Sequence, residues 1–264
     1  MMRSAFALCL VGALGCHAHR GHHGQHAHGH AHGPCPHCPP GAHGHGPHGH
    51  GPHGHGTAAP TPGPHGEHGG HGGHHRFDDP ARWAAVFDNP ARDAWQEPDR
   101  VLARMNLRPN ARVADLGAGT GYFSVRLARA VPQGRVWALD LEPNLVQYLH
   151  DRARRENLGN LFAALCTPEA AMIPEAVDAV LVVDTYHHIE DRTAYFTRLR
   201  PRLAPGGNVV IVDFRLDAPE GPPPAMRLAP ERVREEMQAA GFVQQGDPLM
   251  LARQYVLVFA PATP

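Results

Sequence analysis

The chain has 264 residues with 24 basic and 25 acidic side chains, and every basic residue is arginine. Because lysine is absent, the Schiff-base chemistry of pyridoxal enzymes and the lysine-dependent phosphate binding of P-loop nucleotide hydrolases are both excluded. From Phe77 onward the acidic residues slightly outnumber the arginines, whereas nucleic-acid binders usually carry a basic surplus. Composition therefore argues against a nucleic-acid partner.

The first residues of the chain have the pattern of an export signal. Arg3 precedes an apolar run from Ala5 to Gly15, which is too short to cross a bilayer as a helix. The run ends at Cys16, so residues 1–16 resemble a bacterial lipoprotein signal. That resemblance implies membrane anchoring through a lipid on Cys16 and a location in the cell envelope. The alternative is a cytoplasmic protein with a hydrophobic N-terminus.

The next segment, residues 17–76, holds most of the 23 His residues among Gly, Pro and Ala. It has almost no apolar side chains to bury, so we expect it to stay disordered. Neutral imidazoles at this density are ligands for zinc, nickel or copper, and Cys35, His37 and Cys38 add two thiolates nearby. Loose metal binding is one interpretation of the tract. The other is a flexible spacer whose metal affinity is incidental.

A single folded domain is predicted for residues 77–264, with residues 77–100 as an N-terminal helical lid or cap. Within the cap a short duplication places Asp-Pro and Asn-Pro pairs at the start of two short helices. Its aromatic residues, Trp83, Phe87 and Trp95, either pack as core or cover a ligand. The default for spaced aromatic residues predicts core packing for at least one of them.

Beyond Ala111 short β-branched runs alternate with helical stretches, which predicts an α/β fold: a Rossmann-like, seven-stranded, mostly parallel sheet with helices on both faces. The last strand is expected to be antiparallel. The predicted strands are 112–116, 135–140, 161–166, 177–183, 208–214, 242–248 and 254–259. The predicted helices are 122–130, 143–156, 192–203 and 230–240. Pro205-Gly206-Gly207 predicts a tight turn before the fifth strand.

The motif with the clearest functional meaning lies where the first strand meets the first helix of this alternation. It combines Asp115 with Gly117, Gly119 and Gly121. Glycine lets a ligand approach the backbone closely, and the helix N-terminus offers free N–H groups. A nicotinamide site would need the third glycine one residue later, where Tyr122 stands. The spacing therefore disfavours a nicotinamide oxidoreductase.

From about Val101 to Phe259 the sequence resembles the class I S-adenosylmethionine-dependent methyltransferases. The resemblance implies that S-adenosylmethionine is the cofactor. The residues that it assigns to cofactor binding are Asp115, Gly117, Gly119, Gly121, Asp140 and Leu141. Asp140 would accept hydrogen bonds from both ribose hydroxyls, since a carboxylate has two acceptor oxygens. For the adenine amino group, the stretch after the third strand offers the Glu169 carboxylate or the Thr167 hydroxyl.

Candidates for the acceptor side follow the fourth strand, at the edge where open α/β sheets bind ligands. Asp184 could position a substrate or the cofactor, Tyr186 could offer its ring to a sulfonium, and His187 or His188 could take a proton. The alternative reading has one His capping the next helix and the other in solvent. The Pro-rich segment 215–229 is expected to help roof the acceptor pocket.

These patterns predict an S-adenosylmethionine-dependent methyltransferase that acts on a small molecule. The alternative is an envelope-anchored, His-rich metal-binding lipoprotein whose Rossmann-like domain binds a ligand without catalysis. No metal site is predicted within the domain, which has Cys166 as its one cysteine. The methyl acceptor and the oligomeric state stay open.

Overall fold

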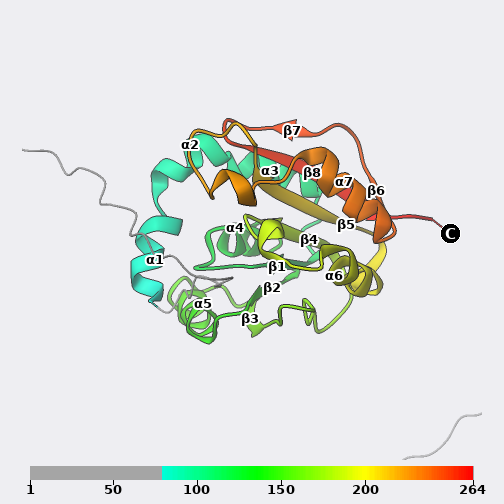
Figure 1. The fold of residues 1–264 in the computed structure, drawn as a ribbon. Helices are drawn as coiled ribbons and strands as arrows, with labels where there is room; N and C mark the ends of the chain where they lie inside the picture. Colours follow the sequence, from blue (N-terminus) through cyan, green and yellow to red (C-terminus); the bar gives the residue numbers. More distant parts are fainter. Residues whose placement is uncertain (1–78, 264) are drawn as a thin grey trace, which may run out of the picture. The chain divides into compact units, whose positions relative to one another are not determined.

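The computed structural model describes residues 79–263, which form a mixed α/β fold (Figure 1). The predictions for the leader and the His-rich tract lie outside the described residues. The strands are β1 (Arg112–Leu116), β2 (Arg135–Asp140), β3 (Leu161–Leu165), β4 (Val177–Val183), β5 (Leu203–Phe214), β6 (Phe242–Gln244), β7 (Leu249–Met250) and β8 (Gln254–Pro261). Their order in the sheet is β3-β2-β1-β4-β5-β8-β6, with β7 paired to β8.

The pairing confirms the predicted fold class. Strands β1 to β5 run parallel to one another, whereas β8 is antiparallel to β5, β6 and β7. One predicted strand was wrong, because 242–248 contains only the three-residue β6, and the two-residue β7 follows separately. The predicted turn at Pro205-Gly206-Gly207 is a bulge inside β5, where the pairing with β4 jumps from Leu203 to Asn208.

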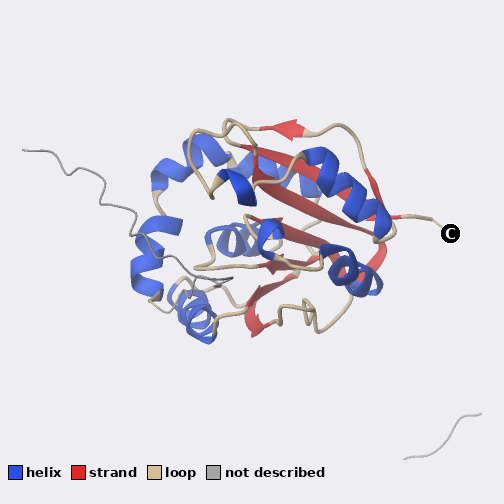
Figure 2. Cartoon of the chain, viewed as in Figure 1, coloured by secondary structure: helices blue, strands red, loops and turns tan. Residues whose placement is uncertain are grey.

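The helices lie on both faces of the sheet (Figure 2). They are α1 (Pro80–Phe87), α2 (Asp93–Gln96), α3 (Pro98–Met105), α4 (Tyr122–Ala130), α5 (Pro143–Arg155), α6 (Arg192–Leu199) and α7 (Pro230–Ala239). Residues 79–263 also contain the 3₁₀ turns η1 (Pro90–Arg92), η2 (Tyr186–His188), η3 (Arg200–Arg202) and η4 (Pro224–Met226). None of the helices within 79–263 is both long enough and apolar enough to span a membrane.

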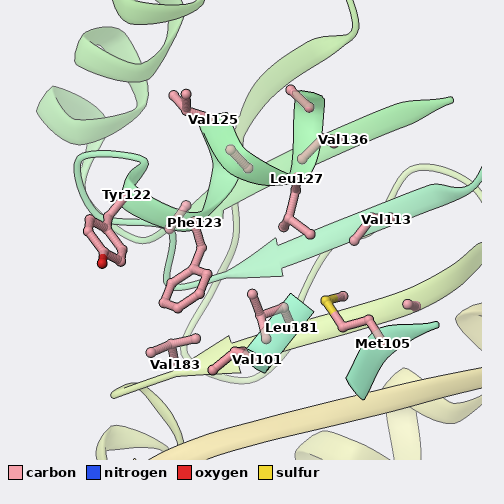
Figure 3. Packing of buried hydrophobic residues seen from close by; sticks show 14 of the residues in the cluster. Val101, Met105, Val113, Tyr122, Phe123, Val125, Leu127, Val136, Leu181 and Val183 are labelled. Carbon is pink, nitrogen blue, oxygen red and sulfur yellow. The ribbon is translucent and has the colours of Figure 1, made fainter. Parts of the chain in front are cut away.

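Two apolar cores fix the layers. One core packs α3, α4 and α5 on one face of the sheet, and the other packs α6 and α7 on the opposite face. In Figure 3, Phe123 and Leu127 of α4 point toward β1 and β4. Burial of such side chains on both faces explains why the central strands read as continuous apolar runs.

The N-terminal cap begins as the duplicated signals predict. The Asp79 carboxylate accepts a hydrogen bond of 3.1 Å from the Arg82 N–H, and Pro80 opens α1. The Asn89 side chain likewise accepts from the Ala91 N–H at 2.9 Å, and Pro90 opens η1. Side-chain capping and a proline at the first helical position are both local effects, so the sequence predicts them well.

Candidate active site

A cavity of about 700 Å³ opens at the carboxyl ends of the parallel strands, the edge at which open α/β sheets bind ligands. Its volume falls within the usual range for small-molecule sites, roughly 300–1,000 Å³. The cap contributes Trp83, Val86, Phe87, Arg92 and Trp95 to its walls. The sheet edge contributes residues 115–120, 140–142, 166–169, 183–185 and 187–191, and the segment after β5 contributes Gly221 and Pro222.

The turn between β1 and α4 depends on glycine for two different reasons. Gly117 has φ +72°, and a Cβ built there would lie 2.1 Å from Thr185 Oγ1. Gly119 has φ +57° and lines the cavity beside the Phe87 ring. Gly121, in contrast, is not among the cavity-lining residues; a Cβ there would meet Leu149 at 2.7 Å. Its role is to let α4 begin close against α5.

Replacing Gly117 with alanine is expected to destabilise the domain. An alanine at positive φ costs about 1–3 kcal/mol, and the contact with Thr185 adds to that cost. Thermal or urea unfolding of the full chain measures the change. Gly159→Ala is the matched control, because a Cβ at Gly159 has no atom within 4 Å; its expected effect is below about 0.5 kcal/mol. Equal losses in the two variants would contradict the steric account.

Asp140 ties the end of β2 to the glycine turn. Its Oδ2 accepts a hydrogen bond of 2.8 Å from the Gly119 N–H, and its Oδ1 accepts one of 3.0 Å from the Glu142 N–H. Burial raises the pKa of this carboxyl, while the backbone hydrogen bonds oppose the shift. Asp140 and the next residue, Leu141, both line the cavity. The structure therefore brings the predicted acid of β2 to the predicted glycine turn.

Asp115, at the end of β1, also lines the cavity and is buried. The Ser124 hydroxyl donates to its Oδ2 at 2.5 Å. Burial raises the pKa of Asp115 to about 6, the Ser124 hydrogen bond opposes the shift, and the nearby Asp140 charge adds to it. Two acids held together in a buried place favour a ligand that brings positive charge or hydrogen-bond donors.

The residues present fit the cofactor expected from the sequence. Between the glycines, Thr120 lines the cavity, and its buried hydroxyl has no hydrogen-bond partner within the described part of the chain. An unpaired buried hydroxyl is costly, so its placement favours a polar ligand in this corner. The stretch after β3 also reaches the cavity through Cys166, Thr167 and Glu169, which keeps both predicted adenine partners in range of a ligand.

A buried His–Asp pair lies where the chain leaves β4 and β5. His187 Nδ1 lies 2.8 Å from Asp213 Oδ1, and the two side chains are 3% and 0% exposed. Burial by itself would lower the pKa of His187, but the Asp213 hydrogen bond and charge raise it above its ordinary value. With Nδ1 turned to a carboxylate, the ring presents Nε2 to other partners. Asp213 is not among the site residues predicted from the sequence, since no local pattern joins it to His187.

Tyr186, the ring residue that precedes His187, differs from the expectation. Tyr186 is fully buried, its hydroxyl donates to Glu236 at 3.0 Å, and it is not among the cavity-lining residues. The prediction that its ring faces a sulfonium was therefore wrong. His188 lines the cavity with its ring 4.2 Å from that of His187. Neither His caps the next helix, because the Asp191 carboxylate caps α6.

Asp184, at the end of β4, is held by residues that the sequence does not predict as its partners. It has φ +53°, and its carboxylate accepts from the Gln254 side chain of β8. Gln96 and Arg92 of the cap approach the same carboxylate at 3.5 Å. Burial raises the pKa of Asp184 to about 6, and the Arg92 charge opposes that shift. The partners lie more than 65 residues away in sequence, so only the fold reveals them.

The aromatic residues of the cap line the cavity instead of packing as core. Trp83 and Phe87 stack with ring centroids 5.3 Å apart, and Trp95 lies 5.9 Å from the Phe214 ring. All three cap residues are half-buried and line the cavity. The expectation that at least one of them packs in the core was wrong, because the cap covers the cavity.

The sequence was compared with protein families and with curated proteins. Residues 113–207 match the methyltransferase domain family. Over 116 residues, the chain is 29% identical to the ubiquinone/menaquinone biosynthesis C-methyltransferases of Cupriavidus metallidurans and of Burkholderia cenocepacia, covering 43% of this chain and 47% of each relative. The chain thus matches about half the length of these curated relatives.

Solved structures share the fold. A SAM-dependent methyltransferase from Aquifex aeolicus superposes with a TM-score of 0.63 at 22% identity, covering 69% of this chain and 97% of that one. An O-methyltransferase from neocarzinostatin biosynthesis, solved with S-adenosyl-L-homocysteine and 1,4-dihydroxy-2-naphthoic acid, gives 0.57 at 15% identity, covering 69% and 59%. At these identities, the two likenesses show the fold. Residues 113–207 thus match a methyltransferase domain, and the described residues share the Rossmann-like fold of these solved methyltransferases.

Proposed function

We propose that this protein transfers a methyl group from S-adenosylmethionine to a small-molecule acceptor. The observation that carries the proposal is the junction of Asp140 with the Gly119 backbone, on a glycine turn that opens into the cavity. The buried carboxylate holds the turn in place and stands beside the space that a ribose would fill. Thr120 supplies a further polar group without a protein partner among the described residues.

A small acceptor fits the shape of the site. The cap covers the cavity with aromatic side chains, Phe214 at the end of β5 adds another ring, and the segment after β5 adds Pro222. Such walls suit an apolar or planar molecule and exclude water from the reacting atoms. S-adenosylmethionine, when bound, supplies a methyl group on a sulfonium, so the leaving group needs no further activation. The protein then has to align the two reactants and take up one proton from the methyl acceptor.

His187 is the proposed general base. Asp213 holds Nδ1 of His187. The His187 ring lines the cavity, so its Nε2 atom is left to take a proton from the methyl acceptor. Asp213 itself is a positioning residue, since it is fully buried and acts through the imidazole. His188 stacks on His187 and forms part of the acceptor wall.

Isothermal titration of the full chain with S-adenosylmethionine and with S-adenosylhomocysteine tests the cofactor. Binding of both with one site per chain is expected. Transfer of a labelled methyl group is then measured with panels of phenols, amines and thiols. Absence of binding would overturn the proposed function. Binding without transfer to any class of acceptor would favour the alternative of a ligand-binding domain without catalysis.

A further inference from the structure

The first part of the cap, residues 79–96, makes polar contacts with the rest of the domain at two places, besides the contact of Trp95 with Phe214. One lies at the acceptor end of the cavity, and the other lies at the glycine turn. Between them, the cap side chains Trp83, Phe87 and Trp95 cover the cavity. A covering segment held by a few discrete polar contacts can exist in two positions, because breaking those contacts frees it without disturbing the apolar cores.

The contact at the acceptor end is a relay of side-chain hydrogen bonds. Arg92 Nε donates to Gln96 Oε1, Gln96 Nε2 donates to Gln254 Oε1 at 2.9 Å, and Gln254 Nε2 donates to Asp184 Oδ1. Gln96 and Gln254 are fully buried. The relay therefore links the cap to β8 and then to the end of β4. Amides buried this completely require their partners, so the relay favours one position of the cap.

The contact at the glycine turn passes through Arg152 of α5. Its Nη1 donates to Asp88 Oδ2, at the end of α1, and to the Thr120 backbone oxygen, each at 2.8 Å. One guanidinium nitrogen thus contacts both the cap and the turn. The Arg152 side chain is 15% exposed, which shields this ion pair from solvent.

A second link strengthens the same junction. Tyr122, the first residue of α4, donates its hydroxyl to Asp93 of the cap, and Arg126 pairs with Asp93 at 2.9 Å. Arg92 lies over the Tyr122 ring with 4.2 Å between the guanidinium carbon and the ring centroid. The start of α4, which directly follows the glycine turn, therefore contacts the cap.

From these contacts we infer that residues 79–96 are a lid whose closure is coupled to occupation of the glycine turn, with Arg152 as the connection and Asp184 as a positioning residue. The inference rests on the proposed cofactor for the identity of the coupled ligand. A ligand that fixes the Thr120 carbonyl fixes Arg152, and Arg152 holds Asp88 and the lid. The acceptor wall is complete only with the lid closed, so the cofactor binds first and the acceptor second.

Tryptophan fluorescence of the full chain tests the lid directly. A Trp137→Phe background removes the tryptophan of β2, which leaves Trp83 and Trp95, both in the lid, as reporters. Acrylamide quenching is measured with and without S-adenosylmethionine, whose binding is followed in parallel by titration. Closure of the lid is expected to lower the quenching constant about twofold.

Asp88→Asn and Glu156→Gln form a matched pair in that background. Both residues bond Arg152 at 2.8 Å, but only Asp88 belongs to the lid. Asp88→Asn is expected to bind the cofactor and lose the change in quenching, while Glu156→Gln keeps both. Asp88→Asn is also expected to increase acrylamide quenching in the absence of any ligand. Cofactor binding with unchanged quenching, or equal behaviour of the two variants, would overturn the lid; absence of cofactor binding would overturn the proposed function instead.

Discussion

Replacing Asp140 with alanine is expected to lower the affinity for S-adenosylmethionine by about 100-fold or more. The carboxylate holds the Gly119 and Glu142 N–H groups and stands where the ribose hydroxyls are expected. Each hydrogen bond to a charged group is worth about 1.5–3 kcal/mol, and 1.4 kcal/mol is a factor of ten in affinity. Titration calorimetry measures the loss.

Asp140→Asn is the companion variant, because an amide of the same shape keeps one acceptor oxygen and loses the charge. Its affinity is expected to fall between those of the wild type and Asp140→Ala. Thermal unfolding without ligand checks that both variants fold. If folded Asp140→Ala binds S-adenosylmethionine with wild-type affinity, this carboxylate is not part of the cofactor site.

Replacing His187 with alanine is expected to lower kcat by about 10²–10⁴, the usual contribution of a positioned general base. The affinity for S-adenosylmethionine is expected to change little, since His187 stands at the acceptor end of the cavity. Single-turnover methyl transfer and titration separate the two effects. A loss of cofactor affinity with unchanged kcat would place His187 in the cofactor site instead.

The His187–Asp213 pair also predicts a pH dependence. Only neutral His187 accepts a proton, so kcat is expected to rise with pH through a pKa above the ordinary value of about 6.5. Asp213→Asn removes the charge that raises this pKa, so the rise is expected at lower pH. Stability follows the opposite course: a raised folded-state pKa gives stability below the unfolded pKa that is lost as pH rises through the folded one. Denaturant titrations across this window measure that trend.

The sequence predicts features that depend on neighbouring residues. The Asp-Pro and Asn-Pro pairs locate the starts of α1 and η1, and the spacing of Gly117, Gly119 and Gly121 locates the turn onto which Asp140 closes. Strand β1 through strand β4 follow from apolar runs between these signals. Capping, positive φ and burial on both faces are all encoded locally.

Features that depend on side chains meeting across the sheet are not predicted. Nothing near Gln254 or Gln96 in the sequence marks them as a buried pair, and amide side chains are usually exposed. Tyr186 follows Asp184 in a segment that faces the ligand edge, yet the 3₁₀ turn η2 directs it to Glu236. In each case the deciding partner comes from a distant element.

The position of β8 between β5 and β6 has a consequence for how the protein is synthesised. Gln254 belongs to β8, the last strand among the described residues, yet it connects Asp184 of β4 with Gln96 of the cap. While the ribosome is still making the chain, β5 is an open edge and the relay lacks its middle member. The nascent domain can therefore form its glycine turn early, but it acquires a complete acceptor site only after its final strand has emerged.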